Sequence, residues 1–307
     1  MIRRNLFGCA LLPIALGFVL AMTNAANAQT KEGAPLKVGM AKSFFNDLDP
    51  VIIGIATEPF SKLMKQTTGL EGVLSHSDDA FTTAAKLDSN EFQFGVFHGH
   101  ELAWVQQKHP KLKPLMIVTN SQHDVSTWII VHKDCKAKDV KDLRGKKIDM
   151  PEGTKEHCRI YLASRSTDNA VNNPKAFFGS IVKSKTYIGA LDDVCRGTCD
   201  AAVVDSISLA FYKDIKAACF NKNLRVLEHS RPFPAAVIAY REGSLPPATV
   251  KQFCDGLTKA HQNPEGKDMM SMWQIEGFAP APANYATDLS EVLKSFPSPD
   301  LSKHSWR

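Results

Sequence analysis

Two short stretches of the sequence carry side chains that suit the binding of an anion or a metal ion. Residues 97–101 read Phe-His-Gly-His-Glu, which places His98 and His100 two positions apart beside a carboxylate. Residues 153–157 read Gly-Thr-Lys-Glu-His. Hydroxyl, lysine and imidazole groups bind oxyanions through hydrogen bonds, and neutral imidazole also ligates zinc and copper. These stretches therefore favour ligand binding, either by hydrogen bonds or through a metal.

Residues 153–157 stand at the start of a helix predicted over residues 155–164. The first backbone N–H groups of a helix have no partner within it, and the helix dipole adds positive potential there. Gly153 allows close approach to the backbone, so Thr154 and Lys155 mark a natural anion site. Alternatively, Thr154 is an ordinary N-cap and the next residues lie on a solvated first turn.

One helix end cannot hold a ligand by itself. Its dipole contributes about 0.3–2 kcal/mol, whereas micromolar binding requires about 8 kcal/mol. Several charge-assisted hydrogen bonds of about 1.5–3 kcal/mol each must therefore converge. Ser126 and Thr127, together with Lys155 or His157, are our candidates to supply them.

The pair His98 and His100 has three interpretations. With His123 or His157 the two imidazoles could coordinate zinc or copper. At the end of a strand predicted over residues 92–97, one imidazole could instead contact a ligand while the other caps the next helix, or both could be structural. Because a lone His-x-His is a weak metal signal, we expect His98 to contact the ligand and no metal to bind.

Two further residues are candidates for the site. Asp205 ends a strand predicted over residues 201–204, where an acid/base residue, a ligand contact or a helix N-cap would all fit. Phe45 lies with Phe44 in the loop after the first strand, where each would either pack over the ligand or belong to the core. We expect Trp104 and Trp128 in the core.

The sequence lacks the motifs of common enzyme classes. It contains no Gly-x-Ser-x-Gly elbow, no His-Glu-x-x-His, no phosphate-binding Gly-x-x-x-x-Gly-Lys and no dinucleotide fingerprint. Asp192 and Asp193 are adjacent, so on a helix they point apart and make a poor catalytic pair. We expect neither enzymatic activity nor a cofactor. The formal net charge of +5 has acids and bases mixed along the chain, which predicts no nucleic-acid partner.

Alternating strands and helices must position these residues. Apolar runs predict strands, and apolar residues at helical spacing predict helices between them. This alternation is typical of largely parallel sheets covered by helices, an α/β fold. The predicted strands cover residues 36–40, 92–97, 128–131, 147–150, 201–204 and 235–239; the predicted helices lie near residues 53–64, 78–87, 139–143, 155–164, 188–194, 247–261, 266–275 and 285–293.

The first residues predict export. Arg3 and Arg4 precede an apolar stretch over residues 11–22, and Ala26-Asn27-Ala28 is a cleavage signal. We expect cleavage after Ala28 and a periplasmic protein, exported by either the general or the twin-arginine route. Six of the seven cysteines remain after this cleavage, and in that oxidising compartment an even number predicts disulfides. Cys195 and Cys199 are close enough in sequence to pair, although 15 connectivities remain open.

The order of these elements resembles the type II periplasmic solute-binding proteins, in particular the phosphonate, phosphite and phosphate branch that serves ABC importers. The resemblance implies two lobes, two hinge crossings and a central cleft. It implies one lobe from residues 29–127 and 240–307, and a second, disulfide-containing lobe from residues 128–239. Four stretches carry it: residues 125–134, 142–148, 200–206 and 277–285.

The resemblance also implies site residues. In the family a Ser-Thr-Ser-Gly-His loop opens a helix and grips the ligand, and Thr154 and His157 match it, whereas Gly153, Lys155 and Glu156 depart from it. Ser126-Thr127 matches the pair of hydroxyl ligands of the family. Asp205 matches an acidic residue that faces an amino group of the ligand.

The resemblance implies capture of a small oxyanion and delivery to a membrane permease by a monomer. Phosphate, phosphite, an alkylphosphonate, a sulfonate or an organic acid would all suit such a site. Two other functions stay open from the sequence. One is a periplasmic metal-binding protein that uses His98 and His100, and the other is a ligand-sensing subunit of a membrane sensor.

Overall fold

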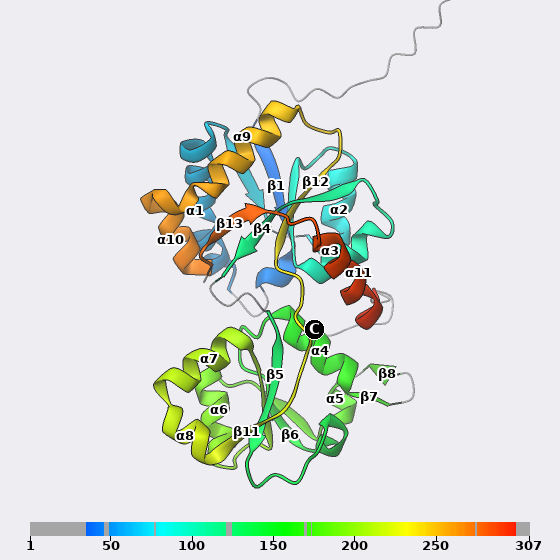
Figure 1. The fold of residues 1–307 in the computed structure, drawn as a ribbon, viewed down its shortest axis with the longest axis vertical. Helices are drawn as coiled ribbons and strands as arrows, with labels where there is room; N and C mark the ends of the chain where they lie inside the picture. Colours follow the sequence, from blue (N-terminus) through cyan, green and yellow to red (C-terminus); the bar gives the residue numbers. More distant parts are fainter. Residues whose placement is uncertain are drawn as a thin grey trace, which may run out of the picture. The chain divides into compact units, whose positions relative to one another are not determined.

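The computed structural model describes residues 35–45, 49–76, 78–120, 125–168, 171–172, 174–273 and 275–298. The expected signal peptide, with its cleavage site after Ala28, and His123 lie outside these residues. Within them the strands form a six-stranded sheet, a five-stranded sheet and a two-stranded hairpin (Figure 1). An α/β fold built on two sheets is the predicted class.

The first sheet has the order β13-β4-β12-β3-β1-β2. Strand β1 pairs in parallel with β2 and β3, whereas β12 runs antiparallel to both β3 and β4, and β13 runs antiparallel to β4. The strands are β1 (Leu36–Met40), β2 (Gly72–Ser75), β3 (Phe94–Phe97), β4 (Leu112–Thr119), β12 (Val237–Arg241) and β13 (Gly277–Pro280).

Local signals explain where the helices beside this sheet begin. The Asp49 side chain accepts a hydrogen bond from the Val51 N–H, and that of Asp79 accepts from the Phe81 and Thr82 N–H groups, as N-caps do. The helices are α1 (Pro50–Thr68), α2 (Ala80–Asp88), α3 (Gly99–Gln106), α9 (Pro247–Thr258), α10 (Pro264–Trp273) and α11 (Tyr285–Ser295), with 3-10 turns at Lys42–Phe45 and Ala260–Gln262.

The second sheet has the order β11-β5-β10-β6-β9. Strand β10 is buried along its whole length, which agrees with its unbroken Ala-Ala-Val-Val sequence. The strands are β5 (Thr127–His132), β6 (Lys147–Asp149), β9 (Ser180–Val182), β10 (Ala201–Asp205) and β11 (Leu224–His229), with the hairpin β7 (Thr167–Asp168) and β8 (Val171–Asn172). The helices are α4 (Glu156–Arg165), α5 (Pro174–Phe177), α6 (Tyr187–Cys195), α7 (Ser206–Ile215) and α8 (Ala217–Asn223), with a 3-10 turn at Val140–Leu143.

The expectation of largely parallel sheets is wrong, because both sheets are mixed. In the second sheet β5 runs antiparallel to β10 and β11, whereas β6 runs parallel to β10 and β9. Strand β5 of the second sheet follows β4 of the first sheet, and strand β12 of the first sheet follows β11 of the second sheet. Neither is joined to its predecessor by a crossover helix within one sheet. Neighbouring parallel strands are joined by a crossover connection, usually a helix. Strands β5 and β12 arrive without such a connection, and both pair antiparallel with their neighbours.

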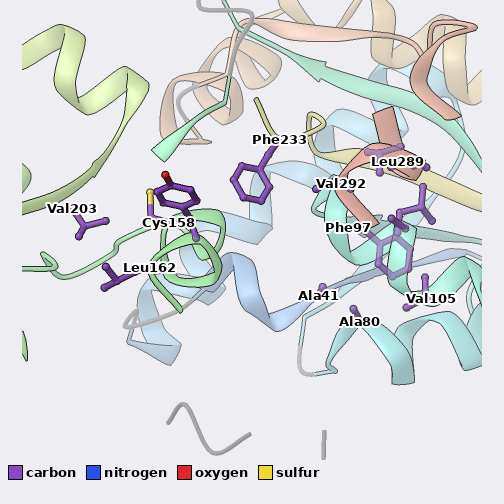
Figure 2. Packing of buried hydrophobic residues seen from close by; sticks show 14 of the residues in the cluster. Ala41, Ala80, Phe97, Val105, Cys158, Leu162, Val203, Phe233, Leu289 and Val292 are labelled. Carbon is purple, nitrogen blue, oxygen red and sulfur yellow. The ribbon is translucent and has the colours of Figure 1, made fainter. Parts of the chain in front are cut away.

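The chain passes between the two sheets twice, once after β4 and once after β11. The two connecting segments meet where Val125 and Phe233 form an isolated antiparallel bridge, in which the Phe233 N–H donates to the Val125 carbonyl at 2.7 Å. Phe233 belongs to a hydrophobic cluster that includes Cys158 and Leu162 of α4 and Val292 of α11 (Figure 2). The second connecting segment is therefore packed into the core at Phe233.

The structure places the cysteines and tryptophans partly as predicted. A disulfide joins Cys195 to Cys219, not to Cys199, and the other cysteines of the described residues are free thiols. Trp104 is buried, as predicted, and Trp128 is only half-buried. Across the described part of the chain, no helix has both the length and the apolar character that a membrane crossing requires.

Candidate functional site

Helix α4 begins where the sequence predicts an anion site. Gly153 has φ +70°, a left-handed conformation that favours glycine. The N-cap position belongs to Lys155, which makes no side-chain capping bond. The alternative in which Thr154 caps this helix is therefore wrong. Thr154 is buried, and its hydroxyl donates to the Pro151 carbonyl.

A pocket of about 240 Å³ lies at this helix start, and Gly153, Thr154, Lys155 and Asp205 line it. Helices α6 and α7 also begin at the pocket. Their first turns are capped, because Thr186 accepts from the Gly189 N–H at 3.1 Å and Asp205 accepts from the N–H groups at the start of α7. The first turn of α4 differs, because the side chain of its N-cap residue, Lys155, makes no capping bond.

Asp205 is engaged mainly with its own helix. One carboxylate oxygen accepts from the Ile207 and Ser208 N–H groups at 3.0 Å, and the other accepts from the Ser208 hydroxyl at 2.8 Å. Burial alone would raise the pKa of Asp205, but Lys155, His157 and Ser208 hold it below its ordinary value. The carboxylate is therefore charged and acts as an N-cap, and its contact with a ligand stays a prediction.

Strand pairing brings Ser126 and Thr127 next to Asp205. Thr127 stands opposite Asp205 in the ladder of β5 and β10, and the Ser206 N–H donates to the Ser126 carbonyl at 2.9 Å. Both hydroxyl residues are buried. The Ser126 hydroxyl accepts from the Trp128 indole at 3.0 Å. Beyond the Cys158 thiol, the Thr127 hydroxyl has no hydrogen-bond partner among the described residues.

The most unusual feature of the site is a group of three histidines, His98, His100 and His157, here named the imidazole cluster. The His98 and His100 rings stack with centroids 5.4 Å apart. Phe233 lies 5.9 Å from the His100 ring and 5.4 Å from the His157 ring. In each of the three rings Nε2 is buried and makes no hydrogen bond with any described residue. Unpaired buried polar atoms are rare in proteins, so this concentration points to a binding site.

Burial keeps the imidazole cluster neutral. It lowers the pKa of His98 to about 3, with the charges of His157 and Lys155 acting in the same direction. Burial lowers the pKa of His157 to about 4, although Asp205 opposes the shift, and it also lowers the pKa of His100. Burial raises the pKa of Glu101 to about 8 against its hydrogen bonds. At neutral pH these four side chains therefore carry no charge.

Most of the site residues predicted from the sequence lie at or near the pocket, but Phe45 has other contacts. Thr154, Lys155 and Asp205 line the pocket, and His157 adjoins them through its electrostatic coupling to Lys155 and Asp205. His98 lies within electrostatic range of His157. Phe45 instead packs edge-on against Trp273 and His76, with centroids 5.5 and 5.4 Å away.

Two aromatic residues lie at the imidazole cluster, and the sequence indicates only one of them. Phe44, which the sequence offers together with Phe45 as a residue that could pack over the ligand, stacks on His98 with centroids 3.8 Å apart. Phe233 lies between two prolines in an irregular segment, where no periodic pattern indicates what it contacts. The flanking prolines are the only local signal that this segment is held in one conformation.

The cluster lacks the geometry of a preformed metal site. Within the described residues, the group of metal-type ligand atoms that lie within 4.8 Å of one another is Asp149, Asp193 and Cys199. Two of these have other partners, since Asp149 accepts from Ser184 and Asp193 pairs with Arg196 at 2.6 Å. The imidazole cluster forms no such group, so its arrangement suits hydrogen bonding better than metal coordination.

Comparison with known proteins supports a binding role. Residues 44–285 match the family described as ABC transporter, phosphonate, periplasmic substrate-binding protein. Comparison with curated protein sequences gave no match.

Solved structures of low sequence identity share the fold. One is a binding protein component of an ABC phosphonate transporter from Pseudomonas aeruginosa, 14% identical over 88% of this chain and 91% of that chain, with a TM-score of 0.54. A Prochlorococcus marinus protein in complex with methylphosphonate is 12% identical over 84% and 97%, with a TM-score of 0.55. A Xanthomonas citri protein bound to ATP is 15% identical over 85% and 96%, with the same TM-score of 0.55.

Proposed function

Because the chain belongs to the periplasmic substrate-binding family of ABC phosphonate transporters, we propose that it captures a phosphonate-type oxyanion at the start of α4 and delivers it to a membrane permease. The observation that carries this proposal is the meeting of two features: a helix N-terminus whose N-cap side chain makes no capping bond, and three buried imidazoles whose Nε2 atoms have no hydrogen-bond partner among the described residues. The family match favours import over the two other functions considered, metal binding and sensing.

The described residues can supply enough interactions for micromolar binding. Lys155 offers a positive charge, the first turn of α4 offers backbone N–H groups, and Ser126 and Thr127 offer hydroxyls. Hydrogen bonds that involve a charged group contribute about 1.5–3 kcal/mol each, so three or four of them reach the roughly 8 kcal/mol of a micromolar complex. Thr154 contributes less as a donor, since its hydroxyl proton is directed at Pro151.

The wider organisation of the protein supports the same function. We place the lobe boundaries near residues 127 and 240. The chain passes between its two sheets after β4 and after β11, so that a hinge movement can open and close the site. We place the start of the mature protein at Gln29, after cleavage behind Ala28, and take the working form to be a monomer in the periplasm. These placements set the protein to be used in experiments, residues 29–307.

A ligand screen on this mature protein tests the proposal. Methylphosphonate, phosphite and phosphate should raise the melting temperature, because a ligand at 100 times its dissociation constant stabilises the folded state by about 2.7 kcal/mol. Zinc and copper, with the chelator omitted, serve as the comparison for the metal-binding alternative. If no oxyanion shifts the melting temperature while a metal does, the proposed function is wrong.

A further inference from the structure

The connecting segment that follows β11 is held against two helices of the first sheet, α3 and α11. The Tyr285 hydroxyl of α11 donates to the Ala235 carbonyl at 2.6 Å. On the other side, a Cβ atom at Gly99, where α3 begins, would lie only 2.5 Å from the side chain of Pro234. Helices α3 and α11 also pack on each other. Residues 233–235 are therefore fixed relative to the first sheet.

Phe296, the C-cap residue of α11, is held at three points. Its backbone carbonyl accepts from the Trp104 indole of α3 at 2.8 Å, and its backbone N–H donates to the Val292 carbonyl at 2.8 Å. Its ring stacks on Phe233 of the connecting segment, with centroids 4.8 Å apart and planes 25° apart. The Phe296 ring is therefore fixed in position on the side of the first sheet.

Two successive turns of α4 pack on these two stacked rings. The His157 ring lies 5.4 Å from the Phe233 ring, and the Tyr161 ring meets the Phe296 ring edge-on at 6.5 Å, measured between centroids. Residues four apart lie on the same face of a helix, so one face of α4 makes both contacts. Tyr161 is also held from behind, since its hydroxyl donates to Glu228 of β11 at 2.6 Å.

The contact between Phe296 and Tyr161 joins the two parts of the protein in addition to the two connecting segments. Phe296 is fixed beside the first sheet, whereas Tyr161 is fixed beside the second. The imidazole cluster draws rings from both parts, and its Nε2 atoms are buried, so the two parts are closed on each other. A hinge movement that carries α4 away from α3 must separate Tyr161 from Phe296.

We propose that Phe296 is a latch, which holds α4 through Tyr161 in the closed arrangement and so raises the affinity for a ligand that it does not touch. A ligand that binds only the closed arrangement has an apparent dissociation constant that rises as the closed fraction falls. An aromatic pair changes such an equilibrium about two- to twelvefold. The effect on affinity rests on the function proposed above, whereas the effect on closure does not.

Small-angle X-ray scattering of the mature protein without ligand measures closure itself. Phe296→Ala should have a larger radius of gyration than wild type, and Phe296→Tyr, which keeps the ring, should match wild type. Phe220→Ala is the control, because Phe220 is also half-buried but belongs to α8 and packs in a different cluster. It should lower the stability to urea and keep the wild-type radius. Equal radii for Phe296→Ala and wild type would overturn the latch.

Binding of methylphosphonate gives the second measurement. Calorimetric titration should show a dissociation constant about two- to twelvefold higher for Phe296→Ala and a wild-type value for Phe296→Tyr. Stopped-flow fluorescence should show faster release without slower association, because an open site stays accessible.

A double-mutant cycle shows whether the two residues act through one contact. Tyr161→Ala should weaken binding as Phe296→Ala does, and the double variant should lose no more than either single variant. Additive losses would overturn the proposal, because they would show that the two side chains act separately. If the wild-type protein binds no oxyanion, the function proposed above fails, and the scattering comparison alone decides the latch.

Discussion

The residues at the start of α7 and the imidazole cluster lie in the same candidate site, but they differ in whether their polar side-chain atoms have hydrogen-bond partners within the protein. Asp205 uses both carboxylate oxygens within its own helix, and the nearby Ser126 hydroxyl already accepts from Trp128. His98, His100 and His157 leave one ring nitrogen each buried and unpartnered in the described structure. Family likeness points to the first group and to His157, whereas the cost of unpaired buried atoms points to all three histidines.

This difference separates residues whose hydrogen bonds hold the site together from residues whose polar atoms are left to bond a ligand. A capped helix and a paired hydroxyl hold the backbone in place whether or not a ligand is present. An unpartnered buried imidazole gains a hydrogen bond only when something else arrives. The following changes test that division, beginning with the largest expected effect.

The largest effect concerns the protonation of Glu101, the buried carboxyl group beside the imidazole cluster. The pKa of Glu101 is about 8 in the folded protein, above its ordinary value of 4.5. A raised pKa contributes stability that is present at low pH and is lost as pH rises through the folded value. The wild-type protein should therefore lose roughly 3–4 kcal/mol of unfolding free energy through this group between pH 5 and 8. Glu101→Gln, which has an amide in place of the carboxyl, should not show that loss.

Urea unfolding at pH 5, 6, 7 and 8 measures this effect. The histidines act in the opposite direction, because their folded pKa values of about 3 and 4 for His98 and His157 lie below 6.5, so their contribution is lost on acidification. Comparing Glu101→Gln with wild type cancels that contribution. Parallel curves for the two proteins would show that Glu101 is ionised in the fold and that this side of the site is charged.

The next effect separates two lysines of the same pocket. Lys155 faces the pocket and the imidazole cluster, whereas Lys185 lines the same pocket but pairs with Glu152 at 2.8 Å and is largely exposed. Lys155→Ala should weaken methylphosphonate binding by about 1.5–3 kcal/mol, which is roughly tenfold to 150-fold. Lys185→Ala is the control and should change binding by less than about 0.5 kcal/mol. Equal losses in calorimetric titration would mean that only the net charge of the pocket matters.

A smaller effect is expected at Thr127. Valine has nearly the same shape, so Thr127→Val should weaken binding by about 0.5–1.5 kcal/mol without destabilising the fold. Thr83 supplies a matched control, because it is also buried with an unpartnered hydroxyl but belongs to α2. Thr83→Val should leave the dissociation constant unchanged. A Thr127→Val protein with wild-type affinity would place Thr127 among the residues that only build the site.

The smallest effect on binding is expected at Asp205. Asparagine caps helices about as well as aspartate. Asp205→Asn should therefore leave the free energy of unfolding nearly unchanged and should keep the dissociation constant for methylphosphonate within about threefold. Asp205→Ala should lose about 1 kcal/mol of stability because the cap is removed. Titration with an aminoalkylphosphonate decides the remaining question, since a large loss for that ligand alone would show that Asp205 contacts its amino group.

Much of the architecture follows from the sequence, for physical reasons that single residues illustrate. The buried run of β10 and the apolar spacing of α1 depend on local periodicity, so both could be predicted. The antiparallel insertion of β12 between β3 and β4 depends on a connection from the other sheet, which no local pattern encodes. The same limit applies to the site. Lys155 at the start of α4 follows from a helix signal, whereas the contacts of Phe233 with two imidazoles depend on the meeting of distant segments.

The most direct test of the account observes the ring nitrogens themselves. Long-range ¹H–¹⁵N spectra of the mature protein distinguish Nδ1 from Nε2 in each histidine, and the His98→Gln, His157→Gln and His261→Gln variants assign the signals. We expect neutral rings at pH 7, and we expect the Nε2 signals of His98 and His157 to move when methylphosphonate is added, while those of His261 stay still. Unchanged His98 and His157 signals at saturating ligand would contradict the placement of the site.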